Sequence, residues 1–169
     1  HEPDYVLVLG GDHIYTMNYA KMLAAHVQTE AELTVGCIEV PLEEAKGFGV
    51  MSVDEEYRIT RFAEKPSEPE CVPGKPDVAL ASMGIYIFSM EFLTNALIRD
   101  AEDETSQHDF GKNIIPAAIQ SAKSIAYPYL DSRGEPDYWR DVGSLFSYWK
   151  ANIELCDIEP ELNLYERDW

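Results

Sequence analysis

The segment at residues 7–15 places chemically active groups directly after an apolar run. It reads LVLGGDHIY, so Asp12 follows two glycines at the end of the run. An apolar run that ends in glycine is typical of a strand buried on both faces of a parallel sheet, and the glycines leave room for a sharp turn and a ligand. Ligands of open α/β sheets bind beyond the carboxyl ends of such strands, where Asp12 could hold Mg²⁺ beside a phosphorylated substrate. On this segment alone, an Asp12 that caps a turn is an equal alternative.

A second candidate pair is formed by Glu64 and Lys65, which stand before Pro66. A carboxylate beside an ammonium suits a sugar phosphate, because glutamate accepts hydrogen bonds from hydroxyl groups and lysine acts as a point charge on phosphate. Taken alone, a surface ion pair at the end of a strand is the simpler interpretation.

Glycine and serine interrupt two further apolar segments. Residues 47–50 read GFGV, and two glycines at the start of a strand either form a bulge or let a ligand approach the backbone. Residues 82–86 read SMGIY, in which Ser82 and Gly84 weaken an apolar strand. A turn or tight packing would explain both as well as a ligand would.

Two more segments carry carboxylates near predicted helix starts. Residues 138–143 read YWRDVG, and Asp141 is either a second oxygen ligand for the cation at Asp12 or an acid that favours a helix N-terminus. Residues 108–112 read HDFGK, where Asp109 is an N-cap for the next helix. His13 and His26 show no spacing typical of a zinc site, and we interpret both as structural.

The composition favours a folded, acidic protein. Hydrophobic residues make up 46% of the 169 residues, and 13 basic against 31 acidic residues give a formal net charge of −18. Such a charge argues against nucleic-acid binding, which needs clustered cations. There is no apolar stretch long enough to span a membrane, and the start HEPDY does not read as a signal peptide. Three widely spaced cysteines predict free thiols in a reducing cytoplasm.

Periodicity predicts the elements that must position these groups. We expect strands at residues 5–9, 33–40, 80–88 and 124–129, and a hairpin formed by residues 47–53 and 57–64. We expect helices at residues 18–28, 91–99, 110–122 and 144–156. The first strand, helix and second strand form a βαβ unit, which implies a right-handed crossover and a parallel sheet. Pro116 must kink the third helix or split off its first turn.

The last predicted helix has an amphipathic pattern. Ser144 is its expected N-cap. Its apolar side chains are spaced to pack inward together, and they are Leu145, Tyr148, Trp149 and Ile153.

The chain enters a strand at Tyr5 without a preceding phosphate loop, and neither GxGxxG nor GxxxxGK[ST] occurs in it. A doubly wound domain normally begins with a strand and such a loop. We therefore expect a piece of a longer protein whose N-terminal units are absent.

Taken together and in this order, the segments resemble the glucose-1-phosphate adenylyltransferases (ADP-glucose pyrophosphorylases) of bacterial glycogen synthesis. The matching stretches are GGDHIY, GFGVM, EKP, SMGIYIF, HDFGKNIIP, YWRDVGS and YWKANIEL, spread along the chain from Tyr5 to Trp169. SMGIY, HDFGK and YWRDVG separate the chain from the uridylyl- and thymidylyltransferases that share the fold.

The resemblance implies an α/β fold, a Rossmann-like (GT-A-like) nucleotidyltransferase domain with a mixed, mostly parallel sheet flanked by helices. Residues 1–157 would form the C-terminal portion of the catalytic domain. Residues 158–169 would form a linker towards a left-handed β-helix domain that is missing, as are the N-terminal units with their glycine-rich ATP loop.

The reaction implied is ATP plus α-D-glucose 1-phosphate to ADP-glucose plus diphosphate, with Mg²⁺, in the cytoplasm. The implied partners are these two substrates and further copies of the chain, the full-length family forming homotetramers, with no nucleic acid and no membrane. Because half of the ATP site is absent, we expect the chain to be inactive alone.

The resemblance also assigns roles to single residues. Asp12 and Asp141 resemble the metal-binding pair, Asp12 being essential to catalysis, and Lys65 orients the sugar phosphate. The residues that resemble the glucose 1-phosphate contacts are Gly49, Glu64, Lys65, Ser82, Tyr86, Asp109, Phe110 and Trp139.

Three alternatives stay open. Another sugar-phosphate nucleotidyltransferase, uridylyl or thymidylyl, would share the fold. A non-catalytic sugar-phosphate-binding module would share it too, although an intact Asp12, Asp141 and Lys65 argue against a degenerate copy. A metal-dependent glycosyltransferase would require a D-x-D pair, and Asp12 stands in GGDH without one.

Overall fold

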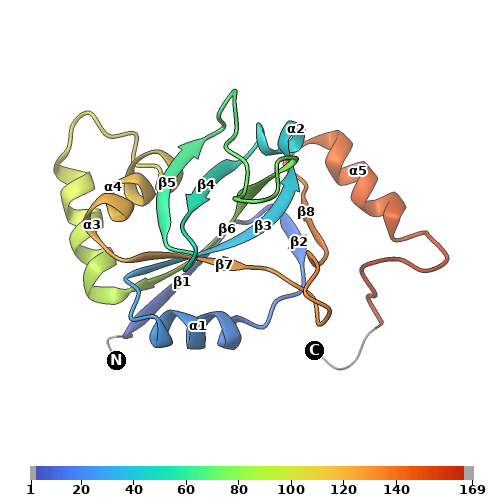
Figure 1. Ribbon diagram of the computed structural model, residues 1–169, viewed down its shortest axis with the longest axis horizontal. Helices are drawn as coiled ribbons and strands as arrows, with labels where there is room; N and C mark the ends of the chain where they lie inside the picture. The colour runs from blue at the N-terminus through green and yellow to red at the C-terminus, as the bar shows by residue number, and fades with distance from the viewer. Residues whose placement is uncertain (1–2, 166–169) are drawn as a thin grey trace.

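A six-stranded mixed sheet forms the centre of the molecule, and a two-stranded sheet lies beside it (Figure 1). The computed structural model describes residues 3–165. The strands of the large sheet are β1 (Tyr5–Leu9), β3 (Leu33–Pro41), β4 (Gly49–Val53), β5 (Ile59–Glu64), β6 (Val78–Ser89) and β7 (Ser124–Pro128). The small sheet pairs β2 (His13–Tyr15) with β8 (Trp139–Asp141).

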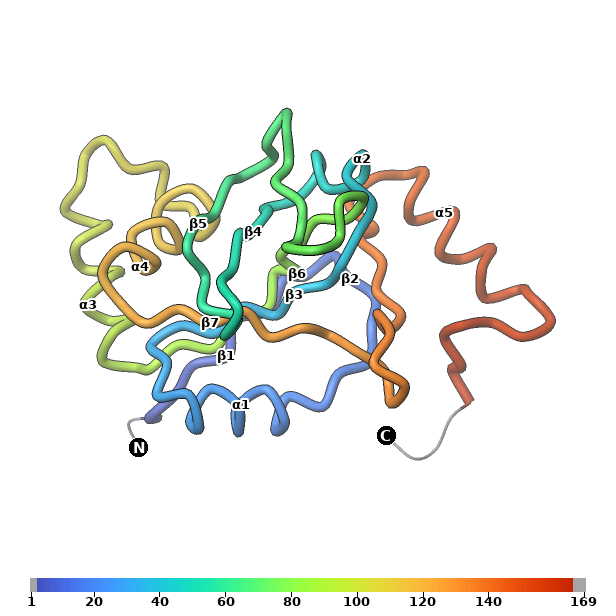
Figure 2. Tube along the Cα trace, viewed as in Figure 1, coloured from blue at the N-terminus to red at the C-terminus, as the bar shows by residue number. Residues whose placement is uncertain are grey.

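Helices cover both faces of the large sheet. They are α1 (Tyr19–Gln28), α2 (Leu42–Ala45), α3 (Met90–Glu102), the π-helical turn η1 (Phe110–Ile114), α4 (Ile115–Ser121) and α5 (Leu145–Glu154). Met22 of α1 packs in one buried cluster with β3 and β6, and Leu93 of α3 packs with η1 and α4 in a second cluster. Figure 2 shows α1 along one side of the sheet, α3 and α4 together on another, and α5 standing apart. Among the described residues, no helix has the length and apolarity needed to cross a membrane.

The expected mixed α/β sheet flanked by helices is confirmed, but its neighbouring strands are mostly antiparallel. The long strand β6 lies between β3 on one edge and both β1 and β4 on the other, and it runs against all three. Because of this insertion β1, β3, β4 and β7 share one direction, while among the described strands only β3 and β7 are parallel neighbours. The parallel βαβ expectation therefore holds for the direction of β1 and β3 and fails for their pairing.

The first strand is less buried than its apolar sequence predicts. Val6 and Val8 pack against the second cluster, whereas Tyr5, Leu7 and Leu9 are 39%, 38% and 44% exposed. Burial on both faces is thus wrong for β1, because the described elements cover the face that carries Tyr5, Leu7 and Leu9 only in part.

The predicted helix at residues 110–122 changes type just before Pro116 without a break in the helical chain. The π-helical turn η1 ends at Ile114, and α4 begins at Ile115 with the proline in its first turn. Asp109 accepts a hydrogen bond from the Lys112 N–H (2.9 Å), so its predicted role as an N-cap is confirmed.

The predicted N-cap of α5 is confirmed, but the inward packing of the helix is wrong. Ser144 and Ser147 form a reciprocal capping box. The four apolar side chains predicted to be buried are largely exposed, Leu145 at 90%, Tyr148 and Trp149 at 56% and Ile153 at 49%. Helical spacing places these residues on one face, but only a neighbouring element can bury that face, and among the described residues none covers it.

Candidate active site

The large sheet opens in the middle of β6. The ladder with β4 ends at Ala81, and the ladder with β1 begins at Ile85 on the same edge of the strand. Between them Gly84 adopts a positive φ of 68°, a conformation that favours glycine. The segment after β1 lies at this opening, since the Gly10 N–H donates to the Gly84 carbonyl (2.8 Å). On the other side β4 borders the opening with Gly49, which pairs with Glu64 of β5.

The small sheet brings Asp12 and Asp141 together. His13 stands opposite Asp141 in the register of β2 and β8, and the Val142 N–H donates to the Asp12 carbonyl (2.9 Å). A Cβ atom at Gly143 would lie 3.0 Å from Asp141 Oδ1 and 3.1 Å from Asp12 Oδ2. Both carboxylates therefore border the same small space, which Gly143 keeps open.

This pair fits a divalent cation that takes only two of its ligands from the protein. Mg²⁺ is usually bound through one or two carboxylates, with water and substrate phosphate completing its octahedron. The described residues contain no group of three or more His, Cys, Asp or Glu side chains that could hold a metal. The donor set thus matches Mg²⁺ shared with a phosphate better than an ion enclosed by protein, such as structural zinc.

A second acidic cluster forms around Glu64, at the end of β5. Its Oε2 would lie 3.1 Å from a Cβ at Gly49 and 2.9 Å from a Cβ at Gly111. Asp109 Oδ1 would lie 3.4 Å from the same Gly111 Cβ. At Gly49 the Phe62 ring lies closer still, so glycine there makes room for that ring. The two carboxylates meet at Gly111, an arrangement able to accept hydrogen bonds from neighbouring hydroxyl groups.

Tyr86 and Phe110 form the apolar wall beside these carboxylates. Their rings stack at 6.1 Å with an interplanar angle of 13°, and the Tyr86 hydroxyl lies 3.4 Å from Ser82 Oγ. Burial raises the pKa of Tyr86, and the charges of Glu64 and Asp109 raise it further. The phenol therefore stays protonated at neutral pH and offers a hydroxyl next to Ser82.

Lys65 follows Glu64 in a strained backbone conformation. Its φ is 47°, unusual for a residue with a side chain, and its N–H donates to the Phe48 carbonyl (3.0 Å). The side chain is exposed, and within residues 3–165 no carboxylate forms an ion pair with it. Strain of this kind is concentrated at functional sites, and here it occurs at a lysine that directly follows Glu64.

Trp139 lies between the two clusters. Only 5% of it is exposed, and its ring packs edge-on against both Phe48 and His13 at 5.2 Å. The structure thus places Trp139 behind Phe48, as a support for the site, and its predicted contact with a sugar phosphate stays a prediction.

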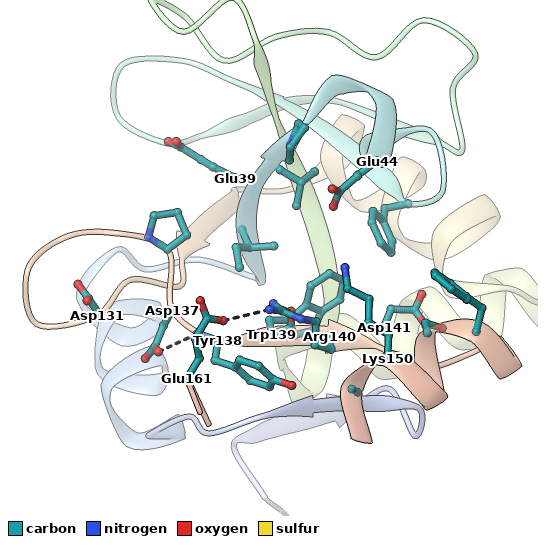
Figure 3. Close-up of a pocket in the computed structure, with 18 of the residues that line it drawn as sticks. Glu39, Glu44, Asp131, Asp137, Tyr138, Trp139, Arg140, Asp141, Lys150 and Glu161 are labelled. Carbon is teal, nitrogen blue, oxygen red and sulfur yellow. Dashed lines mark hydrogen bonds and ion pairs between the residues drawn. The ribbon is translucent and has the colours of Figure 1, made fainter. Parts of the chain in front are cut away.

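A cavity of about 650 Å³ adjoins the site and shares Trp139 and Asp141 with it (Figure 3). Arg140 is held there by Glu154 (2.9 Å) and Glu161 (3.0 Å), and Figure 3 shows acidic side chains around it. Arg133 and Lys150 also line the cavity, and they pair with Asp131 (2.7 Å) and Glu154 (4.0 Å). Each cation of the cavity thus has an acidic partner.

Sequence reasoning missed several residues that shape the site. The room at Gly10 is filled by the His13 ring and holds no ligand, since a Gly10 Cβ would lie 3.0 Å from His13 Cε1. Gly111 and Gly143 make space for the carboxylates but carry no local signal beyond their place in HDFGK and YWRDVG. The strands β2 and β8 are too short to show a period.

Gly84→Ala is expected to destabilise the fold more than Gly74→Ala. Both glycines have a positive φ, 68° and 80°, but a Cβ at Gly84 would lie 2.8 Å from His13 Cε1, whereas nothing lies within 4 Å at Gly74. Strain costs each variant about 1 kcal/mol or more, and the clash adds about 1–3 kcal/mol at Gly84. Urea unfolding monitored by tryptophan fluorescence measures the difference. Equal losses would show that the His13 ring yields without cost.

Comparison with known proteins gives consistent results. A family model described as nucleotidyl transferase matches residues 1–158. The chain is 61% identical over its whole length to the glucose-1-phosphate adenylyltransferase of Thiobacillus denitrificans, of which it covers 38%. It is 60% identical over its whole length to the protein of the same name from Hydrogenovibrio crunogenus, of which it covers 40%. The chain thus spans well under half the length of these curated relatives.

Proposed function

The chain belongs to the nucleotidyl transferase family, and on that premise we propose that it supplies the sugar-phosphate and cation sites of a glucose-1-phosphate adenylyltransferase. The reaction converts ATP and α-D-glucose 1-phosphate to ADP-glucose and diphosphate. The 53–61% identity to proteins of that name supports this choice over uridylyl and thymidylyl transfer.

One observation carries the proposal, the convergence of two distinct acidic groups at the opening of one sheet. The cluster of Glu64 and Asp109, with the uncovered ammonium of Lys65, has the chemistry of a sugar-phosphate site. The pair of Asp12 and Asp141 has the chemistry of a cation site that shares its ion with phosphates. A nucleotidyl transfer needs both, because positioning and charge neutralisation provide most of its rate.

The sugar phosphate is oriented by the first cluster. Glu64 and Asp109 accept hydrogen bonds from sugar hydroxyls, and Lys65 attracts the phosphate as a point charge. The stacked Tyr86 and Phe110 bound the sugar, and the protonated Tyr86 hydroxyl hydrogen-bonds to it. A phosphate oxygen then attacks the α-phosphorus of ATP in line, and the bond to the departing diphosphate breaks.

Asp12 and Asp141 are the residues that would hold Mg²⁺. When bound, this cation neutralises charge on the reacting phosphates. The chain's own contribution is to present two carboxylates on one side of Gly143 and to fix Asp141 through the Gly143 N–H, which donates to its Oδ1 at 2.7 Å.

We further propose that the activity belongs to a longer polypeptide. Residues 1–157 would act as the C-terminal portion of its catalytic domain and residues 158–169 as a linker to a β-helix domain. The greater length of the relatives supports this proposal. Free cysteines agree with a cytoplasmic location, and the exposed apolar faces of β1 and α5 support assembly into an oligomer.

A nucleotide comparison tests the proposed function. The full-length protein, given Mg²⁺ and glucose 1-phosphate, is expected to form its sugar nucleotide faster from ATP than from UTP or dTTP, as measured by liquid chromatography. The 169-residue chain alone is expected to show no turnover. A preference for UTP or dTTP would favour the corresponding transferase, and binding of glucose 1-phosphate without turnover would favour a non-catalytic module.

A further inference from the structure

His13 lies where the segments of the candidate active site meet. It begins β2, follows Asp12 directly and stands opposite Asp141 in the register of β2 and β8. Its side chain is only 12% exposed. The proposed reaction requires no chemistry of this imidazole, so its burial beside both carboxylates calls for another explanation.

The ring fills the opening of the large sheet. A Cβ at Gly84 would lie 2.8 Å from His13 Cε1, and a Cβ at Gly10 would lie 3.0 Å from the same atom. The two glycines are joined by a hydrogen bond from the Gly10 N–H to the Gly84 carbonyl (2.8 Å). The ring is therefore packed against backbone on this side, and backbone yields less than a flexible side chain.

The other side of the ring contacts Trp139. The two rings meet edge-on at 5.2 Å, and Trp139 meets Phe48 in the same way and at the same distance. Phe48 precedes Gly49, which borders Glu64. A continuous row of rings thus joins the cation side of the site to the sugar-phosphate side.

The polar atoms of His13 show a clear asymmetry. Nε2 lies 3.4 Å from Asp12 Oδ1, whereas Nδ1 is buried and has no hydrogen-bond partner among the described residues. A buried N–H without an acceptor is rarer in proteins than an unused acceptor. Nε2 is therefore the ring nitrogen placed to donate toward Asp12, across a distance that is long for a hydrogen bond.

We infer that His13 is a positioning residue for the cation site. Its ring fills the space beside Gly10 and Gly84 and so stabilises this part of the fold, and its Nε2–H restrains the Asp12 carboxylate that would hold the cation. The inference rests on the proposed function and adds to it the residue that holds a cation ligand in place.

Three variants of the full-length protein test this role. His13→Ala is expected to weaken Mn²⁺ binding about 10–100-fold, as removal of a residue that orients a metal ligand does. Electron paramagnetic resonance of free Mn²⁺ measures this affinity without turnover. The same variant is expected to lower kcat about 10²-fold, with the KM for glucose 1-phosphate within about threefold of wild type.

The other two variants separate the ring from its nitrogen. His13→Gln keeps an amide N–H near the position of Nε2 and is expected to retain most of the Mn²⁺ affinity. His13→Phe keeps the ring, so it is expected to preserve the melting temperature but not the Mn²⁺ affinity. His26→Gln is the matched control, because His26 is a buried histidine whose Nδ1 bonds Thr34 Oγ1 (2.8 Å) away from both carboxylates. It is expected to lower the melting temperature and leave Mn²⁺ affinity unchanged.

Wild-type Mn²⁺ affinity and kcat in His13→Ala would overturn the inference, and so would His13→Phe binding Mn²⁺ as tightly as His13→Gln. If the alanine variant does not fold, the comparison of glutamine with phenylalanine decides. A wild-type protein that binds Mn²⁺ without forming a sugar nucleotide would contradict the proposed function, while the same affinities would still decide the role of His13.

Discussion

Asp12→Asn is expected to lower the kcat of the full-length protein about 10²–10³-fold, the usual loss when one electrostatic contribution to a transition state is removed. Asparagine keeps the size of the side chain but not its charge, and Asp12 shares the space over Gly143 with Asp141. Because that charge is expected to act mainly on the reacting phosphates in the transition state, the KM values for both substrates should change little.

Steady-state kinetics in saturating Mg²⁺ measure the effect, with Asp77→Asn as the control. Asp77 is an exposed aspartate outside both acidic clusters, in the segment before β6. A kcat of Asp12→Asn close to that of the control would remove Asp12 from the catalytic site. A normal kcat with a raised KM for ATP would give it a binding role only.

Lys65→Ala is expected to raise the KM for glucose 1-phosphate by one to two decades and to leave the KM for ATP nearly unchanged. A charge-assisted contact to phosphate contributes about 1.5–3 kcal/mol, which corresponds to that range. The selectivity follows from the position of Lys65, which directly follows Glu64 at the end of β5. The rings of His13, Trp139 and Phe48 lie between this part of the site and the aspartate pair.

Lys46→Ala is the matched control for this prediction, because its exposed ammonium is neutralised by Glu43 at 2.8 Å. It should change neither KM. An equal rise in both KM values for Lys65→Ala would contradict the assignment of this lysine to the sugar phosphate.

Local periodicity predicted most of the elements because their signals lie within single segments. The apolar run before Asp12, the face of α1 that contains Met22 and the hairpin of β4 and β5 all form close to their expected bounds. Strand order could not be predicted from single segments, because the insertion of β6 between β1 and β3 depends on contacts between segments far apart in the sequence.

The same distinction applies to the site. Motifs predicted which carboxylates matter, but the pairing of β2 with β8 that joins Asp12 to Asp141 extends over only three residues on each strand. The sequence around His13 shows no spacing typical of a zinc site, which favours a structural role. That interpretation describes the packing of the ring but not its place beside Asp12 and Asp141. The exposed face of α5 shows a further limit of prediction from sequence, since an amphipathic pattern cannot specify which element covers the apolar face of a helix.

The most direct test of the account is a crystal structure of the full-length protein with glucose 1-phosphate and Mn²⁺, using anomalous scattering to locate the metal. The account predicts Mn²⁺ bound to one oxygen each of Asp12 and Asp141, the sugar hydroxyls on Glu64 and Asp109, and the phosphate beside Lys65. A metal that contacts neither aspartate, or a sugar phosphate bound away from Glu64 and Lys65, would contradict it.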